Sequence, residues 1–152
     1  MLFFLDGGAF ATSYSTYAYL PATEQEVSPR IFLQVSIEGI YTEAFLDTGA
    51  PYVVCKPQVA EVLGLDPEKG EWIKDFRIRN DKLAGRLVRL TVTILAEEGL
   101  PLPVDATVFV PDLDPHQEWG EFPSILGLTG FLERIRFAID PSENRFYFGA
   151  LA

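Results

Sequence analysis

Residues Asp47, Thr48 and Gly49 form a stretch whose side-chain types and spacing could do chemistry. They follow an apolar run, residues 44–46, so a buried strand would deliver a carboxylate to the point where the chain must turn. The Asp47 carboxylate can act as a general base, the Thr48 hydroxyl can tie the loop down, and Gly49 permits a tight backbone path. The tripeptide alone is also typical of an ordinary turn without catalysis, so the surrounding elements must decide between the two interpretations.

Cys55 and His116 are the only cysteine and the only histidine. A catalytic thiol would need that imidazole, and so would a Ser-His-Asp triad, for which no Gly-x-Ser-x-Gly motif occurs. We therefore interpret Cys55 as a small buried apolar residue. One Cys forms no intrachain disulfide, and one Cys with one His cannot supply a typical zinc site. We expect no metal and no cofactor, although carboxylate-bound metals stay open.

The composition indicates one folded, turn-rich domain: 152 residues, 48% hydrophobic and 13% aromatic. A formal net charge of −10 argues against nucleic acid or an anionic membrane as partner. No segment has the roughly 20 apolar residues that a membrane span needs. The apolar start, residues 1–5, lacks a basic beginning and is ended early by residues 6–8, unlike a signal peptide. We expect a cytoplasmic protein.

Short strands separated by turn residues are predicted along most of the chain. Residues 31–37 alternate between apolar and polar side chains, Gly39 ends that strand, and residues 40–46 return toward the aspartate. A third short strand is predicted at residues 52–55. A short helix should follow, because Pro57 is favoured at a first helical position and Gly64 just beyond a helix end.

The second half of the chain continues the same pattern. Residues 72–79 and 86–95 predict a long hairpin with a polar tip from Asn80 to Gly85. Further strands are expected at residues 104–110, 124–126, 135–139 and 145–148, with a helical turn at residues 130–134. This arrangement indicates an all-β barrel or sandwich.

Residues 1–29 carry the weakest pattern and are treated as an N-terminal arm. Residues 2–5 and 9–14 could form a small hairpin, and residues 21–29 are predicted to be a connecting loop. Three roles stay open for the arm: packing against the domain, a dimer strand, or a removable pro-segment. The predicted domain is residues 30–152.

The order of these elements resembles that of retropepsin-like aspartic proteases, the single-lobe family typified by retroviral proteases. Residues 47–50 match their Asp-Thr-Gly-Ala active-site loop, the tip at residues 80–85 falls where their flap tip lies, and residues 125–127 match their apolar-apolar-glycine element. The resemblance covers residues 31–149. It implies a closed β-barrel of the retropepsin type with one or two short helices, in a two-fold homodimer.

By this resemblance the protein is an aspartic endopeptidase, which hydrolyses peptide bonds with a water activated by paired carboxylates. The sequence holds a single Asp-Thr-Gly, so the second Asp47 must come from another copy of the chain. Thr48 would hydrogen-bond across the dimer. Gly49 and Gly127 would let backbone segments pass close to the carboxylate.

The resemblance also implies the partners: a second copy of the chain, and a peptide or protein substrate bound as an extended strand. Ala50 and Ile125 would contact the substrate from the active-site side, and Asn80 and Gly85 would contact it from the flap, which closes over it.

The sequence departs from many retroviral members at two positions. Those members have an aspartate after the Ala and an arginine after the glycine of the second motif, where this chain has Pro51 and Leu128. Both partners of that pair are missing together, so the dimer contacts must differ. The competing hypothesis is a catalytically inactive retropepsin-fold module for dimerisation or peptide binding, in which the two Asp47 carboxylates do not meet.

Overall fold

The computed structural model describes residues 1–66, 68–78, 80–113 and 119–152. Within them the chain forms mainly β-strands, with α1 (Pro57–Leu63) as the α-helix and a short 3-10 turn, η1 (Leu132–Arg134). The predicted mostly-β class is therefore confirmed. In the described part of the chain, no helix has the length and apolar character that crossing a membrane requires.

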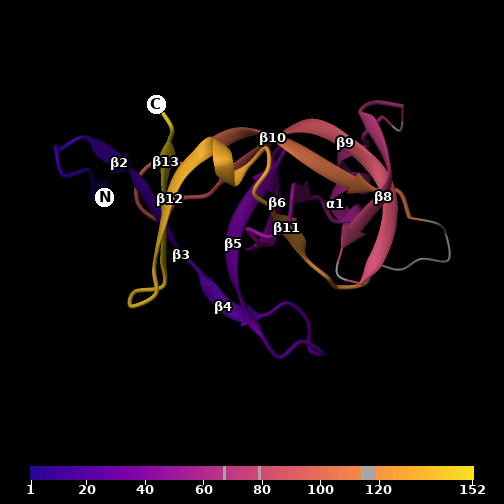
Figure 1. Ribbon diagram of the computed structural model, residues 1–152, viewed down its shortest axis with the longest axis horizontal. Helices are drawn as coiled ribbons and strands as arrows, with labels where there is room; N and C mark the ends of the chain where they lie inside the picture. Colours follow the sequence, from indigo (N-terminus) through magenta and orange to yellow (C-terminus); the bar gives the residue numbers. More distant parts are fainter. Residues whose placement is uncertain (67, 79, 114–118) are drawn as a thin grey trace.

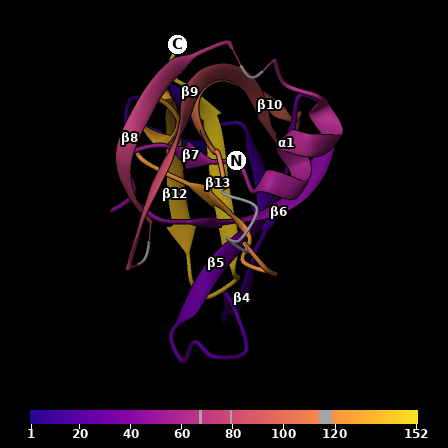
Figure 2. The same cartoon turned by 90° about the vertical axis from the view of Figure 1, so that its right-hand side faces the viewer.

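The larger sheet has eight strands in the order β4-β5-β6-β11-β7-β10-β9-β8. Their bounds are β4 (Ala18–Pro21), β5 (Pro29–Ile37), β6 (Ile40–Leu46), β11 (Ser124–Leu126), β7 (Val53–Val54), β10 (Leu102–Pro111), β9 (Asp81–Ile94) and β8 (Glu71–Ile78). An additional pairing joins β5 to β9. Six strands therefore form a continuous ring of pairings, in the order β5, β6, β11, β7, β10 and β9. Figure 2 shows β8 and α1 on opposite sides of this ring.

A second, three-stranded sheet joins the two ends of the chain in the order β12-β13-β3. It consists of β12 (Ile135–Asp140), β13 (Arg145–Ala150) and β3 (Ser13–Thr16). Figure 1 shows this sheet at one end of the molecule and the β8–β9 hairpin at the other. The arm thus contributes β3 to the second sheet and β4 to the first, while β1 (Leu2–Phe3) and β2 (Ala9–Ala11) form the small hairpin expected at its start.

The predicted helix forms between its expected signals. Pro57 occupies the first turn of α1, where its missing N–H would have had no helical partner. Gly64 ends the helix in the left-handed conformation, with φ 60°, which glycine adopts without the penalty of a Cβ. The helix confirms that prediction and follows directly from the strand after the aspartate loop.

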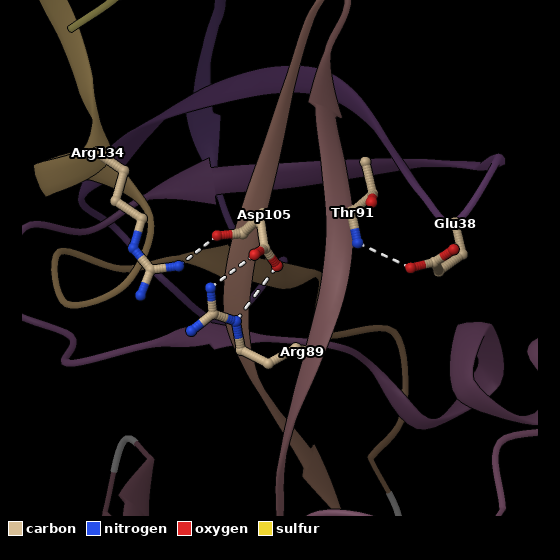
Figure 3. Close-up of polar contacts among 5 residues, drawn as sticks. All are labelled: Glu38, Arg89, Thr91, Asp105 and Arg134. Atoms are coloured by element: carbon tan, nitrogen blue, oxygen red, sulfur yellow. Dashed lines mark hydrogen bonds and ion pairs between the residues drawn. The ribbon is translucent and has the colours of Figure 1, made fainter.

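A two-residue turn sets the register between β5 and β6. Glu38 and Gly39 both have positive φ, 48° and 86°, as in the hairpin turns that match the strand twist. The turn is tied to β9: the Glu38 N–H donates to the Thr91 carbonyl at 2.9 Å, and the Thr91 N–H donates to the Glu38 carboxylate at 2.8 Å (Figure 3). The resulting register pairs Phe32 with Phe45.

Two hydrophobic clusters form the core. The larger one contains buried side chains from both sheets, such as Val35, Val92 and Phe146. The second cluster lies around the end of β6 and joins it to β8, β10 and β11; its buried members are Phe45, Val54, Phe76, Ile78, Leu83, Phe109, Phe122 and Ile125. The rings of Phe76 and Phe109 stack with their centroids 4.2 Å apart, which fastens β8 to this second cluster.

The predicted hairpin tip is wrong in extent. A polar loop is predicted at residues 80–85, but β9 begins at Asp81, which pairs with Ile78. Leu83 pairs with Phe76 in the ladder and is buried in the second cluster, so its burial extends the strand into the expected loop. Gly85 lies inside the strand, paired with Ile73 and Pro111.

Candidate active site

Asp47 lies directly after the last residue of β6, in a loop held by backbone hydrogen bonds. The Gly49 N–H donates to the Asp47 carboxylate at 2.9 Å, and the Ala50 N–H donates to the Asp47 carbonyl at 3.0 Å. The Asp47 N–H donates to the Leu126 carbonyl at 3.0 Å. These bonds fix the carboxylate at a turn that is half-buried, and Thr48 beside it is exposed.

Gly127 holds the neighbouring segment against this loop. Strand β11 runs parallel to β6, and just beyond it the Leu128 N–H donates to the Ala50 carbonyl at 2.8 Å. A Cβ added at Gly127 would lie 2.1 Å from the Tyr52 carbonyl oxygen and 2.8 Å from that of Ala50. Only a residue without a side chain fits here, because the contacting atoms belong to backbone that cannot rotate away.

A cavity of about 230 Å³ opens beside the Asp47 carboxylate. Its walls come from the start of β5, the end of β6 and its loop, β7, the end of β8, and β11 with the segment before it. The lining residues are Arg30, Phe45, Asp47, Gly49, Ala50, Pro51, Val54, Phe76, Arg77, Ile78, Phe122 and Ile125. Six of the aromatic and aliphatic ones belong to the second cluster, so a hydrophobic wall faces the carboxylate.

The cavity brings together several of the predicted site residues. Asp47, Gly49, Ala50 and Ile125 line it, and Gly127 follows the strand that carries Ile125. The two predicted flap contacts are not among the lining residues: Asn80 is exposed beside the end of β8, and Gly85 lies within β9.

Sequence reasoning missed the part of the wall that β8 and Arg30 supply. On the β8 side, Phe76, Arg77 and Ile78 lie within the strand predicted at residues 72–79, but they line the cavity only because the fold brings this strand beside the aspartate loop, which no local pattern indicates. The sequence does carry a signal that Arg30 lies near Asp47. A two-residue turn at residues 38–39 implies a register between the two flanking strands in which residue 30 falls opposite residue 47.

Cys55 is fully buried, with its Sγ 3.6 Å from the Lys56 carbonyl oxygen. Burial raises the pKa of the Cys55 thiol to about 12, which disfavours the thiolate that nucleophilic catalysis needs. His116, the predicted alternative partner, lies outside the described residues. These observations support the interpretation of Cys55 as a buried apolar residue.

The thiol is therefore expected to be inert in the folded protein. With a pKa near 12, about one thiol in ten thousand is ionised at pH 8. We expect no reaction with a thiol-specific disulfide reagent over an hour in buffer, and one equivalent of reaction in guanidinium chloride, which is the internal control. Rapid reaction of the folded protein would contradict the burial of Cys55.

Metal ligands do not gather in the described residues: no group of three or more His, Cys, Asp or Glu side chains is placed to hold an ion there. The chemistry available at the cavity is thus that of the Asp47 carboxylate, the backbone N–H groups of its loop, and two guanidinium groups. The lack of a cofactor stays an expectation.

The Asp47 loop lies within a region that matches a known protein family. The family model described as aspartyl protease matches residues 33–112, more than half of the chain, and includes the Asp47 loop. No curated protein matches the sequence.

Solved structures show a similar fold. The crystal structure of a retropepsin-like aspartic protease from Rickettsia conorii superposes with a TM-score of 0.55 at 19% identity, covering 90% of this chain and 92% of that one. The retroviral protease-like domain of Ddi1 from Leishmania major gives a TM-score of 0.48 at 20% identity, covering 84% and 97%. The first likeness confirms a retropepsin-like fold, while the closed barrel and the homodimer that the resemblance also implied stay predictions.

Proposed function

Because this chain belongs to the aspartyl protease family, we propose that it is an aspartic endopeptidase in which two Asp47 carboxylates, one from each chain of a homodimer, activate a water. The observation that carries the proposal is the position of Asp47: a carboxylate held by the Gly49 N–H faces a cavity large enough for a side chain of a peptide. One carboxylate acts as base on the water, and the other, protonated, polarises the scissile carbonyl.

The dimer follows from this mechanism. Two carboxylates within hydrogen-bond reach share one proton, since like charges so close cannot both ionise easily. The sequence supplies one Asp-Thr-Gly per chain, so a two-fold axis must bring two loops together. The exposure of Thr48 and Gly49 supports this arrangement, because it leaves the loop accessible to a second copy.

The supporting residues take distinct roles in this proposal. Thr48 hydrogen-bonds across the dimer axis and keeps both loops rigid. Gly49 donates its N–H to the carboxylate, and Gly127 lets the segment after β11 lie against the loop. Ala50 and Ile125 contact the substrate from the walls of the cavity.

The β8–β9 hairpin serves as the cover of the site. Its end contributes Phe76 and Ile78 to the cavity, on the side facing Ile125 and the aspartate loop. An extended peptide between the hairpin and the loop would make backbone hydrogen bonds and place alternate side chains in pockets. We propose that the protein works in the cytoplasm on peptides or proteins, with no nucleic acid or membrane as partner.

The test is cleavage of an unbiased peptide mixture between about pH 4 and pH 7. We expect cleavage whose specific activity falls on dilution, because dissociation of the dimer separates the two carboxylates. Sedimentation velocity over the same concentrations should show the dimer disappearing where activity is lost.

Two results would contradict the proposal. Activity independent of concentration in a sample shown to be monomeric would exclude the shared site. A dimeric sample that cleaves nothing across this pH range would favour the competing hypothesis, a retropepsin-fold module for dimerisation or peptide binding.

A further inference from the structure

Arg30 lies at the cavity beside the proposed catalytic carboxylate, and no carboxylate of the described residues pairs with its charge. It is the second residue of β5, and the β5–β6 register, which ends at Phe32 and Phe45, would place it opposite Asp47 two residues further on. Both side chains line the same cavity. Even so, among the described residues Arg30 forms no ion pair with a carboxylate.

The guanidinium of Arg30 is held in place by an aromatic ring. Its Cζ lies 5.1 Å from the centroid of Phe45, a distance typical of a cation–π contact. Its Nε is buried and has no hydrogen-bond partner within the described part of the chain. Buried donors are nearly always paired in folded proteins, so an unpaired one beside a cavity is a donor that a water or a bound group can satisfy.

The charge of the cavity points to the kind of acceptor. The whole chain has 12 basic and 22 acidic side chains, yet the cavity is lined by two arginines, Arg30 and Arg77, and by one carboxylate, that of Asp47. If the two Asp47 carboxylates share one proton, the dimer has one negative charge for four guanidinium groups in its two cavities. A positive pocket in an acidic protein favours an anionic group of the substrate.

We infer that Arg30, assisted by Arg77, makes this cavity a subsite for a carboxylate side chain of the substrate, glutamate or aspartate, close to the scissile bond. The Nε–H and one Nη–H of a guanidinium form a fork that matches the two oxygens of a carboxylate. The inference rests on the proposed function, since it assigns the substrate preference of the same site. Phe45, which holds Arg30 in position, immediately precedes the last residue of β6 before Asp47, so the subsite lies beside the reacting atoms.

The experiment uses one peptide that the wild type cleaves, acetylated and amidated so that its ends carry no charge. Each residue near the scissile bond is replaced in turn by Glu, Gln and Leu, and kcat/KM is measured at about pH 6, where Glu is ionised. At one position we expect Glu to exceed Gln by about tenfold or more, because a charge-assisted hydrogen bond replaces a neutral one. Below about pH 4 the Glu/Gln ratio should fall as the substrate carboxylate takes up a proton.

Variants test whether Arg30 causes the preference for Glu over Gln in the substrate. Arg30→Gln should bring the Glu/Gln ratio close to one, and Arg30→Lys should retain part of it as a point charge without the fork. The matched control is Arg89→Gln, because the Arg89 guanidinium is exposed and bound to Asp105 on β10, with its Nη2 2.7 Å from Oδ2 (Figure 3). Arg89 does not line the cavity, so its variant should keep the wild-type ratio.

Binding separates this inference from the proposed function. The same peptides are titrated into the Asp47→Asn variant and into the double variant Asp47→Asn, Arg30→Gln. This measures binding alone, because neither protein is expected to cleave the peptide. Two outcomes overturn the inference but not the proposed protease function. The wild type cleaves peptides without preferring Glu, or it prefers Glu and Arg30→Gln keeps that preference. If the wild type cleaves no peptide, the Glu, Gln and Leu series is built on a peptide that it binds. Preferential binding of the Glu peptide that Arg30→Gln abolishes then contradicts the proposed protease activity and supports the subsite, and binding without that preference overturns the inference as well. A peptide with a free carboxyl end, compared with its amide, shows whether a terminal carboxylate is preferred, which would count against a side-chain subsite.

Discussion

Asp47→Asn is expected to lower kcat/KM for peptide cleavage by about 1,000-fold or more across the whole pH range of activity, because an amide can neither accept the proton of the water nor donate one to the scissile carbonyl. The substitution keeps the shape of the side chain. The amide oxygen can still accept the Gly49 N–H that now bonds the carboxylate at 2.9 Å, so the loop and the fold should persist. The measurement is steady-state cleavage together with thermal unfolding of both proteins.

Asp6→Asn is the matched control for this experiment. Asp6 accepts the N–H of Gly8, two residues later, at 2.9 Å, the same local bond that Asp47 makes with Gly49. It lies in the exposed connection between β1 and β2. Activity of Asp6→Asn should equal that of wild type. If Asp47→Asn remained active while folded, the carboxylate would not be the base.

Mixing the two proteins tests whether both carboxylates act together. If the active unit is a dimer and one Asn inactivates it, equal amounts of wild type and Asp47→Asn should show about a quarter of the activity of the same total amount of wild type after subunit exchange. Independent sites would retain half. The result therefore distinguishes a shared site from two separate ones without requiring a structure of the dimer.

The aspartate loop and its neighbouring elements were predictable because their signals are local. Alternation in β5 and the apolar run of β6 are determined by burial within a few residues. Pro57 and Gly64 limit the helix through their own backbone preferences. The short strand β11 was recognised because three buried residues end at a glycine.

What escaped prediction depends on contacts between distant segments. All four residues of β4 are exposed, so no burial pattern marks it, and it forms only because it pairs with β5. The true end of the hairpin depends on Leu83 reaching the cluster around Phe109. Arg30 is partly predictable from the sequence. Counting residues back from the turn at Glu38 and Gly39 places it opposite the aspartate. Its cation–π contact with Phe45 depends on the three-dimensional structure.

Gly127→Ala is expected to destabilise the protein by about 3 kcal/mol, at the upper end of the usual range for an overpacked site. The new methyl group would lie 2.1 Å from the Tyr52 carbonyl oxygen and 2.6 Å from its carbon, so backbone rather than a side-chain end must move. Such a loss lowers the melting temperature of a chain of this size by roughly 6–12 °C. Urea unfolding measures the free energy, and differential scanning calorimetry measures the temperature.

Gly8→Ala is the control, because Gly8 has no positive φ and its nearest neighbour would be the end of the Asp6 side chain at 3.2 Å. Its free energy of unfolding should change by less than about 0.5 kcal/mol. Gly127→Ala should also lose activity at temperatures where it is still folded, since the displaced backbone atoms belong to the loop that carries the Asp47 carboxylate. The backbone N–H of Asp47 donates to the carbonyl of Leu126, the residue before Gly127, so this bond is disturbed too. Wild-type stability together with full activity in Gly127→Ala would show that the segment after β11 does not hold the aspartate loop in place.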